Sequence, residues 1–307
     1  MFQELHQSVL LEQAVTALDI NPTGIYLDGT FGRGGHSRLI LDALSESGKL
    51  YVIDCDPEAL AFAHVLAEED SRVYVLAGDF ESMVSELLGE GLQFDGVLFD
   101  FGVSSPQIDD ASRGFSFQKD GPLDMRMNNQ SGDSAADWLN QADADEMKRV
   151  FWRYAEEKNA GRIARAIVEH REENPLVNTS DLVEVVKTVN KPHPKEKKHP
   201  ATRVFQAVRI HINDELGQIE KVLPNALSLL KQGGRFVVIS FHSLEDRIVK
   251  RYFRDMAKAE SMDRRMPVLP DNLRPALLKI VHKPVKAQDV DENVRARSAI
   301  MRVAEKL

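Results

Sequence analysis

The chain has 307 residues, a formal net charge of −9, and 43% hydrophobic and 28% charged residues, a composition ordinary for a globular protein of one or two domains. It contains no apolar run of the roughly 20 residues that a membrane span needs and no signal-peptide pattern, so we expect a cytoplasmic protein without membrane contact. Its single cysteine, Cys55, excludes an internal disulfide and a cysteine-rich metal site, and we expect no metal.

The first hundred residues alternate between strand and helix patterns. After a helical stripe over 10–18, apolar runs predict strands at 25–27, 50–53, 73–77 and 94–99, with helical patterns between them. Asp56 followed by Pro57 is typical of an N-cap with proline at the first helical position. This alternation predicts a parallel, doubly wound sheet with right-handed crossovers.

The alternation stops at about residue 101 and returns at about 217. The intervening segment has helical patterns over 134–140, 143–157, 160–173, 180–189 and from about 201, with no convincing strand. A helix over 216–230, a turn at Gly233 and Gly234, a strand over 235–240, a helix over 244–259 and strands near 277–282 and 298–303 complete seven strands. We therefore expect an α/β domain split into 1–104 and 214–307 around an inserted all-helical domain, 105–213.

A glycine-rich loop over 28–36 joins the first strand to a helix, the position of a nucleotide-cofactor loop. The dinucleotide fingerprint beginning at Gly32 would need glycine at 37, where the chain has Ser37. An acid four residues before Gly-x-Gly, here Asp28 with Gly32 and Gly34, instead resembles the first motif of class I S-adenosylmethionine (SAM) methyltransferases. Asp28 suits the ammonium group of SAM, whereas a dinucleotide would bring a pyrophosphate.

Other strand ends supply candidate contacts to the cofactor, because ligands of open α/β sheets bind outside the carboxyl ends of the strands. Asp54 can accept hydrogen bonds from the ribose hydroxyls. Phe80 can stack on adenine or serve as plain core, and Asp79 beside it can hold the exocyclic amine of adenine. His242, which follows the strand over 235–240, is a candidate for the acceptor pocket, and Ser243 with Asp246 predicts a helix capping box.

Asp100 follows the fourth strand, where amino-methyltransferases of nucleic acids carry Asp, Asn or Ser before Pro-Pro and an aromatic residue. A ring-conjugated amine is a poor nucleophile, and a carboxylate that accepts its N–H can orient it and let its proton leave. Here Phe-Gly-Val replaces Pro-Pro-aromatic, so base stacking must come from elsewhere, with Phe101, Phe115 and Phe117 as candidates. Asp100 could equally contact the cofactor alone.

Basic residues gather in one segment of this acidic chain. Residues 191–212 carry six Lys and Arg against one acid, a local signal of a nucleic-acid partner. A solvated helix face and linker is the default interpretation of this segment, and RNA contact is favoured if the protein is a nucleic-acid methyltransferase. Residues 247, 250, 251 and 254 form a basic stripe on a predicted helix. For that stripe, solvated surface is the simpler interpretation and a phosphate track the alternative.

Seven long strings are similar to one family over essentially the whole chain: the bacterial ribosomal RNA small subunit methyltransferase H family, also called MraW. They are Asp-Gly-Thr-Phe-Gly-Arg-Gly-Gly-His-Ser (28–37), Gly-Val-Ser-Ser-Pro-Gln (102–107), Arg-Gly-Phe-Ser-Phe (113–117), Asp-Gly-Pro-Leu-Asp-Met-Arg-Met (120–127), His-Pro-Ala-Thr-Arg (199–203), Phe-Gln-Ala-Val-Arg-Ile (205–210) and Ser-Phe-His-Ser-Leu-Glu-Asp-Arg (240–247). One departure is Cys55, where a basic residue would be unsurprising.

The resemblance implies a Rossmann-like class I methyltransferase that uses SAM to methylate N(4) of one cytidine in the decoding region of 16S rRNA. It implies SAM contacts at Gly34, Gly35, His36, Asp54, Phe80, Asp100 and Gln107. With the loop and strand-end candidates, the cofactor set is Asp28, Gly32, Gly34, Gly35, His36, Asp54, Asp79, Phe80, Asp100 and Gln107. The catalytic candidates are Asp100 and His242, and the substrate-binding candidates are Ser104, Ser105, Lys195, Lys197, Lys198, His199, Arg203 and Arg209.

Three other functions stay open. They are a NAD-linked oxidoreductase, disfavoured by the incomplete fingerprint, a SAM-binding ribosome-assembly factor without essential catalysis, and an amino-methyltransferase of another nucleic acid. The expected partner is 16S rRNA within the small ribosomal subunit. The sequence leaves open whether the protein forms a homodimer.

Overall fold

The computed structural model describes residues 8–191, 199–258, 275–289 and 296–307. The chain forms two compact units: a sheet unit of Met1–Gly102 and Leu216–Leu307, and a helical unit of Val103–Glu215. Within the described part of the chain, no helix has the length and apolar character needed to cross a membrane.

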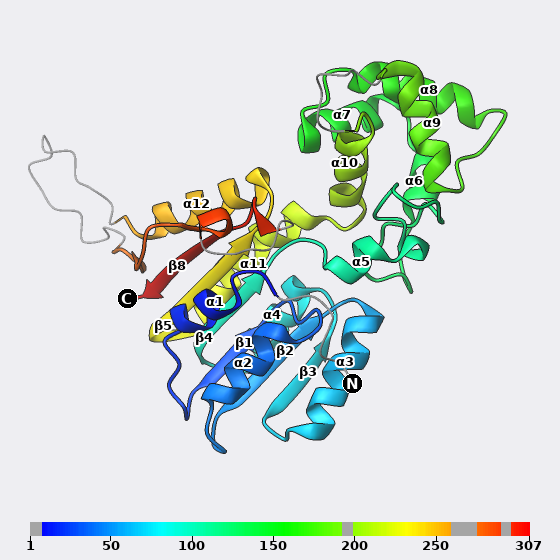
Figure 1. Ribbon diagram of the computed structural model, residues 1–307. Helices are drawn as coiled ribbons and strands as arrows, with labels where there is room; N and C mark the ends of the chain where they lie inside the picture. The colour runs from blue at the N-terminus through cyan, green and yellow to red at the C-terminus, as the bar shows by residue number, and fades with distance from the viewer. Residues whose placement is uncertain (1–7, 192–198, 259–274, 290–295) are drawn as a thin grey trace, which may run out of the picture. The chain divides into compact units, whose positions relative to one another are not determined.

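The sheet unit holds eight strands in its described residues, in the order β3-β2-β1-β4-β5-β8-β6, with β7 paired to β8 (Figure 1). The strands are β1 (Ile25–Asp28), β2 (Lys49–Asp54), β3 (Val73–Ala77), β4 (Phe94–Asp100), β5 (Leu230–Ser240), β6 (Leu278–Ile280), β7 (Val285–Lys286) and β8 (Ile300–Lys306). The first five are parallel and β8 is antiparallel to its neighbours, which confirms the predicted doubly wound, mostly parallel sheet. The prediction of seven strands was wrong because it missed β7, a strand of two residues.

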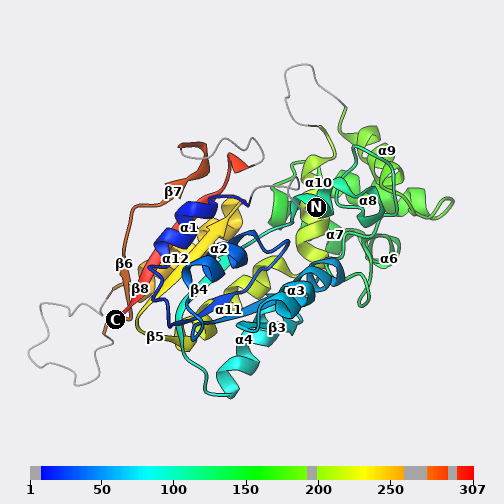
Figure 2. The same ribbon diagram turned by 60° about the horizontal axis from the view of Figure 1, so that its bottom comes forward.

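Helices cover both faces of this sheet (Figures 1 and 2). They are α1 (Leu11–Ala17), α2 (Gly35–Ala43), α3 (Pro57–Glu69), α4 (Phe80–Gly89), α11 (Glu215–Leu229) and α12 (Ser243–Met256), with a short 3-10 turn, η2 (Ala287–Asp289). Successive strand residues point to opposite faces, so Tyr26 and Leu98 pack with α1, α2 and α3, whereas Leu27 and Phe99 pack with α4, α11 and α12. The buried strands therefore lie between two apolar layers.

The turn predicted at Gly233 and Gly234 lies inside β5 instead of before it. Pairing between β4 and β5 jumps from Phe94 opposite Leu230 to Gly96 opposite Arg235, so the residues between bulge out of the ladder. Gly233 has φ of +80°, a backbone conformation that glycine adopts without strain. The strand therefore begins five residues before its predicted start at 235.

The helical unit contains α5 (Ser105–Asp109), η1 (Ala111–Arg113), α6 (Ala135–Gln141), α7 (Ala144–Ala155), α8 (Ala160–Arg171), α9 (Thr179–Val189) and α10 (Thr202–Ile212). Helices α6 to α10 were predicted to within two residues at each assigned end, while α5 and η1 were not predicted. Buried side chains such as Phe151, Ile163, Val186 and Val208 form a core of their own in this unit.

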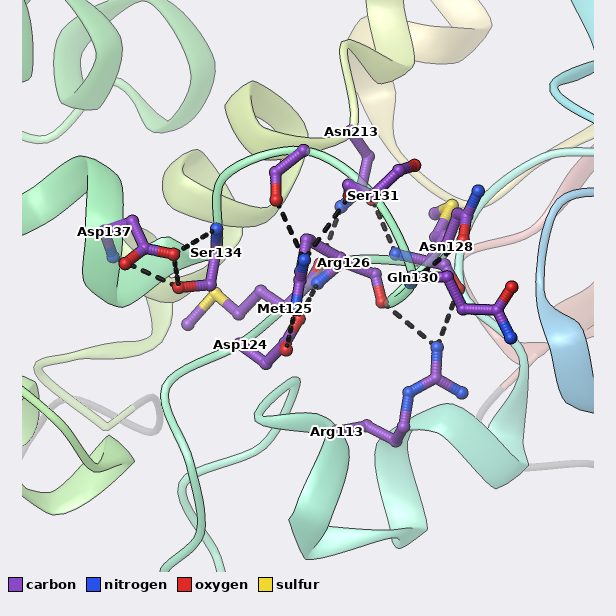
Figure 3. Close-up of polar contacts among 12 residues, drawn as sticks. Arg113, Asp124, Met125, Arg126, Asn128, Gln130, Ser131, Ser134, Asp137 and Asn213 are labelled. Carbon is purple, nitrogen blue, oxygen red and sulfur yellow. Dashed lines mark hydrogen bonds and ion pairs between the residues drawn. The ribbon is translucent and has the colours of Figure 1, made fainter.

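A long loop of the helical unit, residues 113–134, is fixed by polar contacts (Figure 3). The Arg113 guanidinium donates to the carbonyls of Arg126 and Met127, at 3.0 and 2.8 Å. Arg126 forms a bidentate pair with Asp124, at 2.9 and 2.7 Å. Asn213 accepts from the N–H of Met127 at 2.7 Å and donates to the carbonyl of Met125 at 2.8 Å. Arg113 and residues 124–127, which belong to two of the sequence strings, therefore fix the conformation of the loop.

Candidate active site

The glycine loop turns sharply between β1 and α2. Gly32 and Gly34 have φ of +57° and +77°, the left-handed region that glycine adopts without strain. A Cβ on Gly34 would lie 2.7 Å from the Phe31 ring, and one on Gly35 would lie 2.0 Å from Ser8 Oγ. Side chains are thus excluded from this part of the loop.

Asp28, at the end of β1, is buried and bonded within the same loop. Its Oδ2 accepts from Ser37 Oγ at 2.6 Å and its Oδ1 from the Thr30 N–H at 3.2 Å. Burial raises the pKa of Asp28 above its usual value, opposed by His36 and by these hydrogen bonds. Ser37, which interrupts the dinucleotide fingerprint, therefore has a structural role, since its hydroxyl holds the Asp28 carboxylate.

His36 is also buried, and its Nε2 lies 3.2 Å from the Val9 carbonyl oxygen. Burial lowers the pKa of His36, although Asp28 opposes the shift. The ring is therefore neutral near pH 7, and a carbonyl partner requires the proton on Nε2. This contact fixes the ring at the start of α2, within the loop expected to bind the cofactor.

Asp54, at the end of β2, closes the glycine loop from the neighbouring strand. Its Oδ2 accepts from the Gly32 N–H at 2.8 Å and its Oδ1 from the Asp56 N–H at 2.9 Å. Burial raises its pKa to about 6. Each carboxylate oxygen has a second lone pair, so Asp54 can still accept from the two hydroxyls of a ribose.

Asp100, at the end of β4, has a buried carboxylate oxygen, Oδ1, with no hydrogen-bond partner in the described residues. Burial, together with the charges of Asp28 and Glu245, raises its pKa well above the usual value. A buried polar atom without a partner is costly and points to a missing donor. The described parts of the sheet unit therefore leave one acceptor at this edge for a ligand.

Asp79 and Phe80 follow β3 at the start of α4. Asp79 caps this helix, accepting from the N–H and the hydroxyl of Ser82, both at 2.9 Å. The Phe80 ring lies 5.8 Å from the Phe99 ring and 5.4 Å from the Phe101 ring, between ring centroids. Phe80 is thus part of an aromatic cluster, and Phe101, one of the three base-stacking candidates, is almost wholly buried in it.

The capping box of α12 lies one residue earlier than predicted. His242 Nδ1 accepts from the Leu244 N–H at 3.3 Å, and Glu245 accepts from the N–H groups of Phe241 and His242, both at 2.9 Å. The predicted partner Asp246 instead forms a bidentate pair with Arg302, at 2.7 and 3.0 Å. The box predicted from Ser243 and Asp246 was wrong because histidine and glutamate form the cap.

In the helical unit, Ser104 and Gln107 form the capping box of α5. The Ser104 N–H donates to Gln107 Oε1 at 2.9 Å, and the Gln107 N–H donates to Ser104 Oγ at 3.4 Å. Ser105 is the first residue of the helix. Gln107 is buried, so its side chain has a structural role whatever else it contacts.

The other substrate candidates of the helical unit differ in their surroundings. The His199 ring lies against the Phe117 ring, tilted by 31° with ring centroids 4.6 Å apart, and its Nδ1 accepts from the Ala201 N–H at 3.2 Å. Arg209 forms a bidentate ion pair with Glu215, at 2.7 and 2.8 Å, whereas Arg203 is exposed. The candidates Lys195, Lys197 and Lys198 lie outside the described residues.

The structure also adds two residues that the sequence reasoning missed. Thr30 accepts the Asp100 N–H at 2.6 Å, which ties the glycine loop to β4. Glu245 is buried close enough to raise the pKa of Asp100. Glu245 could have been found from its place three residues after His242, the spacing of a capping box.

Carboxylates dominate this edge of the sheet. Among the described residues, Asp28, Asp54 and Asp100 form no ion pair with a lysine or arginine within 4.0 Å. Such an edge would repel the pyrophosphate of a dinucleotide. It suits SAM, which carries an ammonium and a sulfonium, because carboxylates attract cations. The residues present therefore fit SAM better than NAD.

Known proteins agree with this assignment. A model of the MraW methylase family matches residues 3–307. Ribosomal RNA small subunit methyltransferase H of Shewanella loihica is 50% identical over 313 residues, covering 100% of this chain and 99% of that protein. The protein of the same name from Thioalkalivibrio sulfidiphilus is 51% identical over 306 residues, covering 98% and 97%. A solved rRNA methylase from Streptococcus thermophilus aligns with 10% identity and a TM-score of 0.40, over 99% of this chain and 98% of that one, too weak to bear on function.

The family match extends over nearly the whole chain, as the sequence motifs implied. It confirms the expected methyltransferase activity and SAM as the methyl donor. The chain belongs to the MraW methylase family.

Proposed function

We propose that this protein methylates N(4) of one cytidine in the decoding region of 16S rRNA, within the small ribosomal subunit. The relatives are named for methylation of ribosomal RNA of that subunit. The observation that carries the proposal is the buried Oδ1 of Asp100, an acceptor at the end of β4 that has no partner in the described residues. An exocyclic amine has the N–H donor that such an acceptor needs. The substrate implies a cytoplasmic location.

Residues at the sheet edge would hold SAM. Asp54 accepts from the ribose hydroxyls, Asp28 faces the ammonium directly or through water, and Phe80 packs on adenine. The other proposed contacts at this edge are Gly32, Gly34, Gly35, His36, Asp79 and Asp100. When bound, SAM supplies an electrophilic methyl group on its sulfonium sulfur.

Asp100 orients the nucleophile in this proposal. Its carboxylate would accept one N–H of the cytidine amine and so orient the nitrogen lone pair for attack on the methyl group that SAM would supply. As the nitrogen–carbon bond forms, positive charge develops on nitrogen and strengthens this hydrogen bond, and the amine then gives up one proton. The high pKa of Asp100 suits a group that accepts that proton.

His242 remains the second catalytic candidate. Its Nδ1 accepts from the Leu244 N–H, so any contact with the base or its proton falls to Nε2. Replacing His242 with asparagine keeps a side-chain acceptor for the cap and removes the second ring nitrogen. A lower rate with unchanged unfolding temperature would assign the role to Nε2.

RNA recognition is assigned to the inserted helical unit. The basic excess of residues 191–212 supports this, and changing Lys195, Lys197 and Lys198 together to glutamate should weaken substrate binding and flatten its salt dependence. SAM affinity should stay unchanged, because these lysines lie outside every strand-end loop. A wild-type rate with an unchanged salt slope would remove them from the RNA footprint.

One alternative keeps SAM binding but not catalysis: a ribosome-assembly factor that is stabilised by SAM. Radiolabelled methyl transfer to small subunits, to naked 16S rRNA and to another RNA separates the possibilities. Transfer to 16S rRNA supports the proposal, and SAM binding without transfer to any RNA supports the alternative. A homodimer would be detected by sedimentation at several protein concentrations.

A further inference from the structure

The helical unit contains a basic cavity. It has a volume of about 420 Å³ and lies where α7, α8 and the loop joining them meet. Its lining consists of Ala144, Asp145, Lys148, Lys158, Asn159, Gly161, Arg162 and Arg165. Four of these residues are cationic and one is acidic, on a chain whose net charge is −9.

The four cations lack partners within the structure described. Lys148, Lys158, Arg162 and Arg165 are all exposed, and none lies within 4.0 Å of a carboxylate of the described residues. Arg126 and Arg209 in the same unit, by contrast, form short ion pairs. Four like charges around one cavity repel one another, so an anion in the cavity would be stabilising.

The first turn of α8 points to the same ligand charge. It has no acidic residue, and the Asn159 amide donates to Asn190 Oδ1 at 2.7 Å instead of capping the helix. A Cβ on Gly161 would lie 3.4 Å from Lys148 Cδ, so the lysine stem passes over this turn. Cations are unfavourable at a helix N-terminus, whereas an anion is favourable there. The buried Glu157 carboxylate accepts from the Asn159 N–H at 2.9 Å just before this turn, and an anion in the cavity would add a second favourable negative charge.

An exposed aromatic side chain stands on the same helix face as the cavity. Trp152 is 60% exposed, one of six exposed large hydrophobic side chains among the described residues. It follows Lys148 by four residues and Arg149 by three on α7, so the three share a face. Exposed aromatic rings next to basic grooves are typical of proteins that bind single-stranded nucleic acid, where bases stack on the rings.

We propose that the face formed by α7 and α8 binds a single-stranded segment of the RNA substrate. The cations of the cavity contact successive phosphates, and Trp152 stacks on a base. The inference rests on the proposed function and assigns a second RNA contact, independent of residues 191–212. The phosphate contacts contribute an affinity that falls with salt concentration, whereas the contribution of base stacking does not depend on salt.

Charge reversal tests the phosphate contacts. Arg162→Glu with Arg165→Glu should weaken binding to unmethylated small subunits at least about tenfold near physiological salt. The slope of log affinity against log salt should fall by about 1.5, the value for two lost phosphates. The matched control, Lys279→Glu with Lys283→Glu, makes the same charge change at exposed positions outside the cavity and should have a much smaller effect. SAM affinity and unfolding temperature are measured for the cavity variant and for the control. If the charge reversal unfolds the protein, Arg162→Gln with Arg165→Gln replaces it in the same measurements.

Trp152 variants test the stacking contact. Trp152→Ala should weaken binding about tenfold with an unchanged salt slope, and Trp152→Phe should restore most of the affinity. The same loss should appear with a naked RNA fragment of the decoding region. A loss seen only with whole subunits would mean that Trp152 contacts a protein, and it would overturn the stacking proposal.

These outcomes are distinct from failure of the proposed function. If the wild-type protein methylates no 16S rRNA, the function is wrong whatever the variants do. If the wild type methylates 16S rRNA while the cavity variants keep its affinity and its salt slope, the cavity is solvated surface and only this inference fails.

Discussion

The backbone N–H of Asp100 donates to Thr30 Oγ1 at 2.6 Å, which joins the end of β4 to the glycine loop after β1. The two segments proposed to hold the cofactor and the reacting amine are therefore a single connected unit. In the same unit, the Gly32 N–H donates to Asp54 at 2.8 Å, which adds the end of β2. These hydrogen bonds connect the ends of β1, β2 and β4 at this edge.

Replacing Asp100 with alanine should lower the single-turnover methylation rate more than it lowers SAM affinity. The hydrogen bond to the amine strengthens as positive charge develops on nitrogen, so its loss acts mainly on the transition state. The two quantities are measured by quenched-flow methyl transfer and by calorimetry. A fall in SAM affinity large enough to explain the whole rate loss would assign Asp100 to cofactor binding alone.

Replacing Asp54 with alanine should weaken SAM binding by about 1.5 to 3 kcal/mol, because a charged acceptor of two ribose hydroxyls is lost. Asp54→Asn keeps one acceptor oxygen and should weaken binding less. Glu58→Ala, which removes only an exposed pair with Arg33, is the control and should leave the affinity unchanged. Calorimetry that finds wild-type affinity for Asp54→Ala would remove this residue from the site.

SAM affinity should rise with pH through about 6. Burial raises the pKa of Asp54 to about 6, and burial with the nearby charges of Asp28 and Glu245 raises that of Asp100. Ribose hydroxyls and a cationic ligand favour the ionised carboxylates, so binding lowers both pKa values and releases protons where the free protein holds them. The affinity for SAM is therefore weaker below about pH 6 and increases as the pH rises.

Calorimetry in buffers of different ionisation enthalpy measures this proton release directly. Asp54→Asn should remove the part of the rise that is centred near pH 6. A SAM affinity that is the same at about pH 5 and pH 7, with no proton release, would contradict the assignment of these carboxyls to the cofactor site.

Replacing Asn213 with alanine should destabilise the helical unit by about 1 to 3 kcal/mol. The side chain bonds to the Met127 N–H and to the carbonyls of Met125 and Arg209, at 2.7, 2.8 and 2.9 Å. Denaturant unfolding measures the change. Asn128→Ala is the control and should cost far less, because within the described parts of the chain the Asn128 side chain accepts only the Gln130 N–H, at 3.1 Å. Equal stability of the two variants would show that Asn213 does not hold the loop.

The sequence predicted best what local patterns encode. Asp56 caps α3 and accepts from the Glu58 N–H at 3.0 Å, as the Asp-Pro pair indicated, because a cap depends only on its own neighbours. Apolar runs were enough to place β1 to β4, and even β3, a partly exposed strand at the edge of the sheet, carries such a run. The two residues of β7 carry no such pattern and gain their pairing only from β8.

Features that depend on partners distant in the sequence were not predictable. Asp246 was expected in a cap but pairs with Arg302, 56 residues later. The cavity cations Lys148 and Arg162 lie on different helices, and their proximity follows only from the packing of α7 on α8. In the candidate site, the sequence supplied the carboxylates at the strand ends, while the Thr30 bond and the burial of Glu245 came from the tertiary structure.

The central claim is methylation of one cytidine in 16S rRNA, and mass spectrometry of 16S rRNA fragments tests it most directly. Small subunits from cells that lack this modification are incubated with SAM and either the wild-type protein or Asp100→Ala. We expect a single decoding-region fragment heavier by one methyl group, with the methyl on N(4) of cytidine, for the wild type and far less of it for the variant. Fragments of unchanged mass with the wild-type protein, or a methyl group on another base or position, would contradict the claim.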